Sequence, residues 1–149
     1  MRWFLVDRII ECDPGKSVVG VKVFSRSEVF FMDHFNGFPI VPGVLQIEMM
    51  ATTGGKAIKI AKKDWLPVLG SVRNAKFYHN IRPGDQCFIH VEILKLNQNY
   101  CVAKGRVEVD GKKVSQAEII YGVLPADKLT QGYTDPVISE FIKENGVQS

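Results

Sequence analysis

His34 is the histidine of this chain whose surroundings best suit chemistry. It precedes a loop containing glycine and proline, residues 37–39, which leads directly to Pro42 and Gly43. We expect Pro42 and Gly43 to open a helix, whose first backbone N–H groups lack partners within the helix and lie at the positive end of its dipole. A base beside such an oxyanion-binding helix end predicts chemistry on a thioester or another carbonyl compound.

Glu48 is the second candidate, because it is the one ionisable residue between Val44 and Gly55. On a helical wheel it falls at the rim of the apolar face, where a neighbouring wall would desolvate it and raise its pKa above the usual value of about 4.3. The alternative is an ordinary rim carboxylate, solvated near Thr52 and Lys59. Periodicity alone leaves both interpretations open.

The other histidines and the cysteines indicate no site. His90 lies in a run of period-two alternation, which predicts a structural or surface role, and His79 lies beside turn residues. The three cysteines are widely spaced and never form C-x-x-C, so we expect neither a disulfide scaffold nor a metal site. They are Cys12, Cys87 and Cys101. This cysteine usage predicts a reducing, cytoplasmic location.

Length and composition indicate an ordinary globular protein of one domain. Its 149 residues are 46% hydrophobic and 23% charged, which is typical of one globular domain with a single core. The 19 Lys and Arg against 16 Asp and Glu give a formal charge of +3, too mild to indicate nucleic acid but compatible with an acidic partner. No segment approaches the roughly 18 apolar residues of a membrane span, and the first residues do not resemble a secretory signal. We expect a soluble protein.

Hydrophobic periodicity predicts an α+β domain, with one long helix packed on a sheet of about six antiparallel strands. The helix is expected over residues 42–63, where the sequence is rich in helix-forming residues. Strand runs are bounded by turn signals, the strongest being Asp110-Gly111. These runs are residues 5–12, 17–24, 28–32, 67–72, 75–78, 86–96, 100–109 and 112–124.

The predicted helix has an apolar arc and two adjacent glycines. The arc consists of Val44, Ile47, Met50, Ala51, Gly54, Gly55, Ala57, Ile58 and Ala61. It should face the sheet. The opposite face should be exposed to solvent and carries Lys56, Lys59, Lys62 and Lys63. Each glycine inside a helix costs about 1 kcal/mol relative to alanine. We therefore expect a compensating close approach, most simply by the backbone of a strand.

The chain is predicted to divide into a main domain, residues 1–124, and a C-terminal extension, residues 125–149. In the extension, Asp135 suits a helix N-cap and Pro136 the first helical position. Apolar residues from Val137 to Ile142 share one face, so we expect this short helix to dock on the domain. Residues 146–149 are expected to fray.

A family resemblance links His34 with Glu48. The segment from His34 to Glu48, HFNGFPIVPGVLQIE, closely resembles the signature of the bacterial (3R)-3-hydroxyacyl-acyl-carrier-protein dehydratases of the FabZ type, including the interval between the two residues. Four further segments resemble the same family in the same order, so that the resemblance covers about residues 4 to 124. They are Leu5–Glu11, Pro14–Lys16, Pro83–Gln86 and Val109–Lys112.

The resemblance implies a hot-dog fold, in which a curled antiparallel sheet wraps the long helix. It implies a homodimer or a trimer of dimers, in which His34 of one chain meets Glu48 of the other. In that site His34 is the base and Glu48 the proton donor to the departing hydroxyl group. The Gly43 N–H would polarise the thioester carbonyl, the Ile40 carbonyl would orient His34, and Thr52 would support the acid.

The resemblance also implies an acyl carrier protein as partner, with the substrate carried on its phosphopantetheine arm and no metal or redox cofactor. Basic residues near the site should guide this acidic partner. The candidates are Arg73, Lys76 and Arg82, and simple solubility charge is the alternative for each.

The chain departs from the usual family pattern at Asn36, where proline is usual, at Thr52, where glutamine is usual, and at Arg73, where an acidic residue is usual. Three other functions therefore stay open. A dehydratase that also isomerises the double bond usually has Asp in place of Glu48. An acyl thioesterase would need an activated water. A degenerate, non-catalytic subunit would bind an acyl chain without turnover.

Overall fold

The computed structural model of the chain describes residues 5–35, 37–125, 127 and 135–146. Within them, six strands form one antiparallel sheet in the order β1-β2-β4-β5-β6-β3. The strands are β1 (Arg8–Asp13), β2 (Ser17–Val23), β3 (Trp65–Phe77), β4 (Gln86–Leu96), β5 (Tyr100–Val109) and β6 (Lys112–Pro125). The helices are α1 (Phe30–Asp33), α2 (Gly43–Ala61) and α3 (Pro136–Asn145). The predicted α+β architecture is confirmed.

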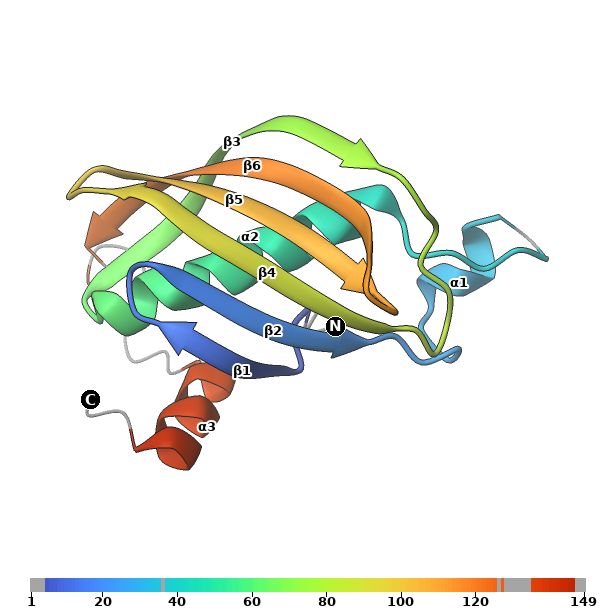
Figure 1. The fold of residues 1–149 in the computed structure, drawn as a ribbon, viewed down its shortest axis with the longest axis horizontal. Helices are drawn as coiled ribbons and strands as arrows, with labels where there is room; N and C mark the ends of the chain where they lie inside the picture. Colours follow the sequence, from blue (N-terminus) through green and yellow to red (C-terminus); the bar gives the residue numbers. More distant parts are fainter. Residues whose placement is uncertain (1–4, 36, 126, 128–134, 147–149) are drawn as a thin grey trace.

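The sheet curls around α2, and the core lies between them (Figure 1). Helix α2 contacts all six strands. Its inward residues Met49, Met50 and Ile58 are fully buried together with Ile89 and Ile119 of the sheet. Burial of each such side chain contributes about 1.5–3 kcal/mol to folding, so this helix is fixed firmly in place. Any side chain that α2 presents at its rim is therefore held on a rigid element.

The adjacent glycines of α2 do make close approaches, but side chains rather than a strand backbone fill the space. A Cβ on Gly54 would collide with the Tyr121 hydroxyl and with Val91. A Cβ on Gly55 would lie 3.2 Å from the ring of Pro67 on β3. The expectation of a passing backbone was wrong, because large side chains of β6, β4 and β3 reach across to the helix.

Two residues of α2 differ in burial from the prediction. Val44 is 72% exposed although it was placed on the arc facing the sheet. Lys56 is buried although it was placed on the solvated face, and its ammonium group pairs with Asp135 at the start of α3. The wheel was drawn for one covered face, whereas α2 is enclosed by the sheet on one side and approached by α3 on another.

Residues 28–32, predicted as a strand, instead lead into the short helix α1. The Phe31 N–H donates to Glu28 O and the His34 N–H donates to Phe30 O. β2 already pairs with β1 and β4, so no sheet edge is available to this segment beside it. The ring of Phe30 packs on Phe24 instead, with ring centroids 5.6 Å apart. Local helical hydrogen bonds and aromatic packing therefore override the β-propensity of the segment.

Residues predicted as two short strands, 67–72 and 75–78, form the single strand β3. Its pairing with β6 shifts register between Leu69 and Ser71 and again between Arg73 and Lys76. Asn74 at the second irregularity has φ of 52°. The interruption in the sequence pattern therefore corresponds to bulges within one strand rather than to a loop.

The C-terminal helix α3 begins as predicted. Oδ1 of Asp135 accepts hydrogen bonds from Val137 N and Ile138 N, and Pro136 follows at the first helical position. Val137 and Phe141 are buried, and α3 lies against β1 (Figure 1). The segment 128–134 and the expected fraying of 147–149 lie outside the described residues. Among the residues described, no helix has the length and hydropathy needed to cross a membrane.

Candidate active site

His34 lies immediately after α1, at the end of the molecule where α2 begins (Figure 1). Its backbone leaves the helical conformation, with φ of −93° and ψ of 94°. The next residue, Phe35, has φ of 62°, a left-handed conformation that is uncommon outside glycine. The rings of His34 and Phe35 meet edge to face at 4.5 Å. The imidazole is thus half-buried on a sharply bent segment, whose neighbour Asn36 lies outside the described residues.

The start of α2 has the free N–H groups that were predicted. Its N-cap is Pro42, whose side chain makes no capping hydrogen bond, and the first turn contains no acidic residue. Among the described residues, the earliest α2 N–H groups with a backbone acceptor are those of Leu45 and Gln46, both bonded to Pro42 O. A Cβ on Gly43 would lie 3.2 Å from the Phe77 ring. Gly43 therefore combines an available N–H with a close contact that a larger residue would disturb.

Glu48 lies on α2 with its side chain exposed, one turn before Thr52. Thr52 Oγ1 donates a hydrogen bond of 3.1 Å to Glu48 Oε1, so Thr52 holds the carboxyl group in one orientation. The exposure of Glu48 in the single chain agrees with the solvated rim carboxylate of the two interpretations, although the residue lines a cavity beside β3.

A cavity of about 220 Å³ adjoins Glu48 between α2 and β3. Its α2 wall is one helical stripe, and the other walls come from β3, β6 and Asp135. The lining residues are Glu48, Ala51, Thr52, Gly55, Lys56, Lys59, Leu66, Pro67, Leu69, Tyr121 and Asp135. The Tyr121 hydroxyl donates to Ala51 O at 2.6 Å. Burial, then the nearby Cys101 and Glu48, raise the pKa of Tyr121, so its hydroxyl stays protonated and the bond persists.

The single chain does not join His34 to Glu48. Among the described residues, no hydrogen bond or ring contact links the two, and the cavity beside Glu48 is not lined by His34. The described part of the chain also shows no hydrogen bond from the imidazole to the Ile40 carbonyl. Within the described residues, His34 is therefore not joined to Glu48 and its cavity.

The predicted docking residues are all exposed. Arg73 and Lys76 lie on β3 at either side of Asn74, opposite Glu118 and Gln116 of β6. Arg82 lies in the turn before β4, where its N–H donates to Asp85 Oδ2 at 2.9 Å. These positions leave the three cationic groups available to a partner.

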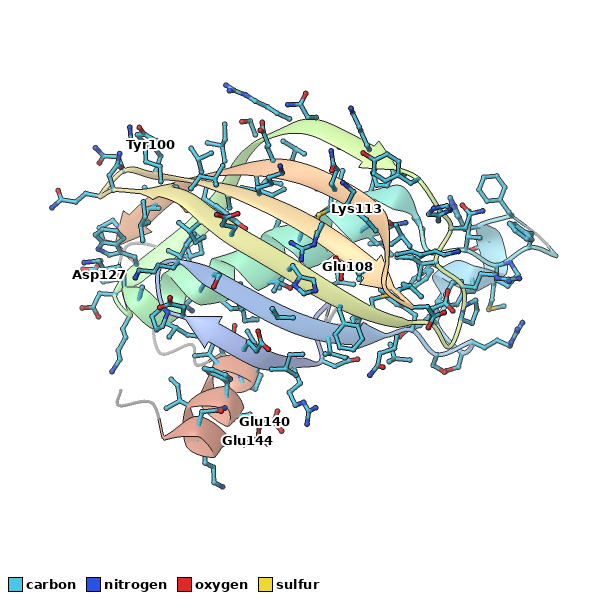
Figure 2. All side chains as sticks on the ribbon, in the orientation of Figure 1. Tyr100, Glu108, Lys113, Asp127, Glu140 and Glu144 are labelled. Atoms are coloured by element: carbon cyan, nitrogen blue, oxygen red, sulfur yellow. The ribbon has the colours of Figure 1, made fainter. Side chains whose placement is uncertain are left out.

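The three cysteines are free thiols, and His90 lies on β4 beside Glu108. His90 Nε2 lies 3.3 Å from Glu108 Oε2, and Glu108 is labelled on β5 in Figure 2. Burial and the nearby Arg106 lower the pKa of His90. Burial raises the pKa of Cys87 to about 12 and the pKa of both Cys12 and Cys101 to about 11. Such thiols are poor nucleophiles at neutral pH. In the part of the chain that the structure describes, no group of His, Cys, Asp or Glu could hold a metal ion.

Sequence reasoning missed the far wall of the cavity. Lys56 was placed on a solvated face, Tyr121 was not singled out, and Asp135 was identified only as a helix cap. One available signal was the spacing of Glu48, Thr52 and Lys56, because residues four apart share a helix face. The contact of Asp135 with this face could not be read from the sequence, because it joins segments 79 residues apart.

Comparison with known proteins agrees with this architecture. Residues 2–118 match the family model described as a FabA-like domain. The 3-hydroxyacyl-acyl-carrier-protein dehydratase FabZ of Clostridium acetobutylicum is 42% identical over 122 residues, covering 80% of this chain and 86% of the relative. FabZ of Ruminiclostridium cellulolyticum is 38% identical over 126 residues, covering 83% and 89% of the two chains.

Solved structures share the fold at low sequence identity. The smu.793 protein of Streptococcus mutans, bound to acetyl CoA, superposes with a TM-score of 0.65 at 12% identity, over 84% of this chain and 94% of the other. The dehydratase heterocomplex ApeI:P of Xenorhabdus doucetiae gives a TM-score of 0.62 at 19% identity, over 75% and 92%. The fold is the hot-dog fold, as the resemblance implied. The chain belongs to the FabA-like family, among the FabZ-type dehydratases.

Proposed function

We propose that this protein removes water from (3R)-3-hydroxyacyl groups carried on acyl carrier protein, giving the trans-2-enoyl product for fatty acid or related lipid biosynthesis. The observation that supports the proposal most strongly is that the signature segment also forms the start of a rigid helix. The His34 to Glu48 segment resembles the family signature, and it places Gly43 at the uncapped start of a rigid helix. Identities of 38–42% to FabZ enzymes over most of the chain support it.

The reaction needs one base and one acid. His34 takes the α-hydrogen as a proton, and the electron pair of the broken C–H bond forms the new carbon–carbon double bond. The C–O bond to the 3-hydroxyl breaks, and Glu48 donates the proton with which that oxygen leaves as water. Proton exchange with solvent then returns His34 to the neutral form and Glu48 to the acid form. Thr52 acts as a positioning residue for Glu48.

The start of α2 stabilises the charge that develops on the thioester oxygen. Removal of the α-hydrogen gives that oxygen enolate character, and a backbone N–H aimed at it lowers the barrier. Gly43 supplies such a group, and no side-chain cap competes for it. We assign to the Ile40 carbonyl the role of orienting the imidazole once the site is assembled.

Assembly of the site requires a second subunit. His34 and Glu48 stay apart in one chain, and Glu48 is left exposed beside the edge strand β3. A two-fold dimer would bring the His34 of each subunit to the Glu48 of the other and supply the wall that desolvates it. We propose a homodimer as the minimal enzyme, with a trimer of dimers as a larger form.

We infer that the reaction uses no metal or redox cofactor, because acid and base groups suffice to remove water. The partner is the acyl carrier protein, and its phosphopantetheine arm brings the acyl group to the site. We retain residues 1–124 as the catalytic domain and residues 125–149 as an extension. The cytoplasmic location remains a prediction.

The docking residues give a prediction that depends on salt. Replacing Arg73, Lys76 and Arg82 together by glutamate should raise KM for a carrier-protein substrate by about tenfold at low salt, because charge at an interface rim controls encounter. KM for the same acyl group on coenzyme A should change much less. Lys63→Glu, an exposed change in the turn after α2, is the control. Equal increases in KM for both substrates would contradict a role of these three residues in docking.

The function itself is tested by incubating the purified protein with 3-hydroxyacyl and trans-2-enoyl thioesters, on carrier protein and on coenzyme A, and following loss or addition of water. We expect both directions of the reaction. Hydrolysis of the thioester without dehydration would show a thioesterase instead. Binding of the acyl chain without turnover would show a non-catalytic subunit.

A further inference from the structure

The cavity beside Glu48 runs along one stripe of α2. Its helical wall is formed by residues 48, 51, 52, 55, 56 and 59, spaced three or four apart. Glu48 and Lys56 are about 12 Å apart along the helix axis, at the usual rise of 1.5 Å per residue. The middle of the cavity is apolar, with Ala51, Gly55 and Pro67 among its lining residues. An acyl chain whose reacting carbons lie at Glu48 would point along this stripe.

Beyond its apolar middle, the cavity is lined by an ion pair and by Lys59. Lys56 Nζ donates to Asp135 Oδ2, and the two side chains are only 11% and 9% exposed. A charged pair so deeply buried is strongly disfavoured unless each charge keeps its partner. An apolar chain end that pressed against it would remove the remaining hydration of the two charges without replacing it.

This ion pair is also fixed by the other hydrogen bonds of Asp135. Oδ1 of Asp135 accepts from the N–H groups of Val137 and Ile138, and Oδ2 is bound by Lys56. Both carboxylate oxygens are therefore engaged, and the residue is at once the N-cap of α3 and the partner of Lys56. Val137 and Phe141 anchor α3 in the core. An incoming acyl chain cannot move this ion pair without loosening the start of α3.

Resting on the proposed dehydratase function, we infer that the Lys56–Asp135 pair ends the apolar part of the acyl cavity and restricts the enzyme to short 3-hydroxyacyl groups. The apolar lining residues lie between Glu48 and this ion pair. Short chains end in the apolar middle of the cavity. Longer chains reach the ion pair and bind poorly in the transition state.

The test compares kcat/KM for 3-hydroxybutyryl, 3-hydroxyoctanoyl and 3-hydroxydodecanoyl groups on carrier protein. The wild-type protein should favour the butyryl over the dodecanoyl group by at least about tenfold. In the double variant Lys56→Met with Asp135→Asn, both charges are removed, and asparagine still caps the helix. This variant should raise the dodecanoyl-to-butyryl ratio by at least about tenfold. Lys63→Met, an exposed change in the turn after α2, should leave the ratio unchanged.

The outcomes separate this inference from the function on which it rests. No dehydration of any substrate by the wild-type protein overturns the proposed function and the inference with it. Dehydration with equal or better use of the dodecanoyl group overturns the inference alone. So does an unchanged ratio in a double variant with native circular dichroism. If the double variant does not fold, Asp135→Asn alone and the wild-type profile decide the question.

Discussion

Replacing His34 by alanine is expected to lower kcat for dehydration by at least about a hundredfold. A positioned general base contributes typically 10²–10⁴-fold, and alanine leaves no group that can accept the α-hydrogen. A hundredfold loss corresponds to about 2.7 kcal/mol of transition-state stabilisation. The measurement is steady-state kinetics of water loss from a 3-hydroxyacyl thioester, together with exchange of the substrate α-hydrogen in deuterated water. Both rates should fall together, since the same base serves both.

His79→Ala is the matched control, because His79 is exposed and is assigned no role in the site. It should keep kcat within about twofold of the wild type. Circular dichroism of both variants should match the wild type, because His34 is only half-buried and lies outside the core. If kcat of the His34→Ala enzyme stays within about tenfold of the wild-type value, His34 is not the base.

Replacing Glu48 by glutamine is expected to lower kcat by a similar factor, at least about a hundredfold, with little change in KM. Glutamine has nearly the same shape, and its Oε1 can still accept the hydrogen bond from Thr52, but it cannot deliver a proton to the departing hydroxyl group. The loss therefore separates proton donation from packing. The measurement is kcat for dehydration, compared with kcat for hydration of the enoyl thioester, which should fall equally.

Thr52→Val provides the contrast to Glu48→Gln. Valine fills the same space but removes the hydroxyl group that donates to Glu48 Oε1. Because Thr52 only positions the acid, its loss should lower kcat by less than about tenfold and leave substrate affinity unchanged. Should Thr52→Val be as damaging as Glu48→Gln, or Glu48→Gln as mild as a control, the proposed division of roles would be wrong.

The sequence was sufficient for those features that depend on neighbouring residues. The long helix, the hairpin at Asp110-Gly111 and the cap at Asp135 each follow from local patterning or turn chemistry, and the structure places them as expected. Residues 28–32 were mispredicted because their β-rich composition is overridden by the absence of a free neighbouring edge on β2. Local propensity cannot report whether a partner strand is available.

Prediction of the site from sequence had a different limit. The signature predicts His34, Gly43 and Glu48 as site residues, and the family resemblance, rather than the spacing, implied that His34 and Glu48 belong to different chains. The burial of Lys56 was hidden, because its partner Asp135 is 79 residues away in sequence. Helical periodicity distinguishes covered from exposed faces for one neighbouring surface only. Only the structure reveals that different elements cover two faces of α2.

The central claim is that each active site combines His34 of one subunit with Glu48 of the other. Both single variants should be nearly inactive alone, yet a dimer of one His34→Ala chain and one Glu48→Gln chain would contain one intact site and one doubly defective site. When the two chains are co-expressed in equal amounts and assort at random, half of the dimers are mixed. About a quarter of all sites are then intact.

The most direct measurement is therefore the dehydration rate of the co-expressed mixture. The proposed shared site predicts recovery to about a quarter of the wild-type rate, at least ten times the rate of either variant alone. A control mixture of the His34→Ala chain with a chain carrying both substitutions contains no intact site and should stay inactive. A His34→Ala and Glu48→Gln mixture that likewise stays inactive, although mixed oligomers are present, would contradict the account.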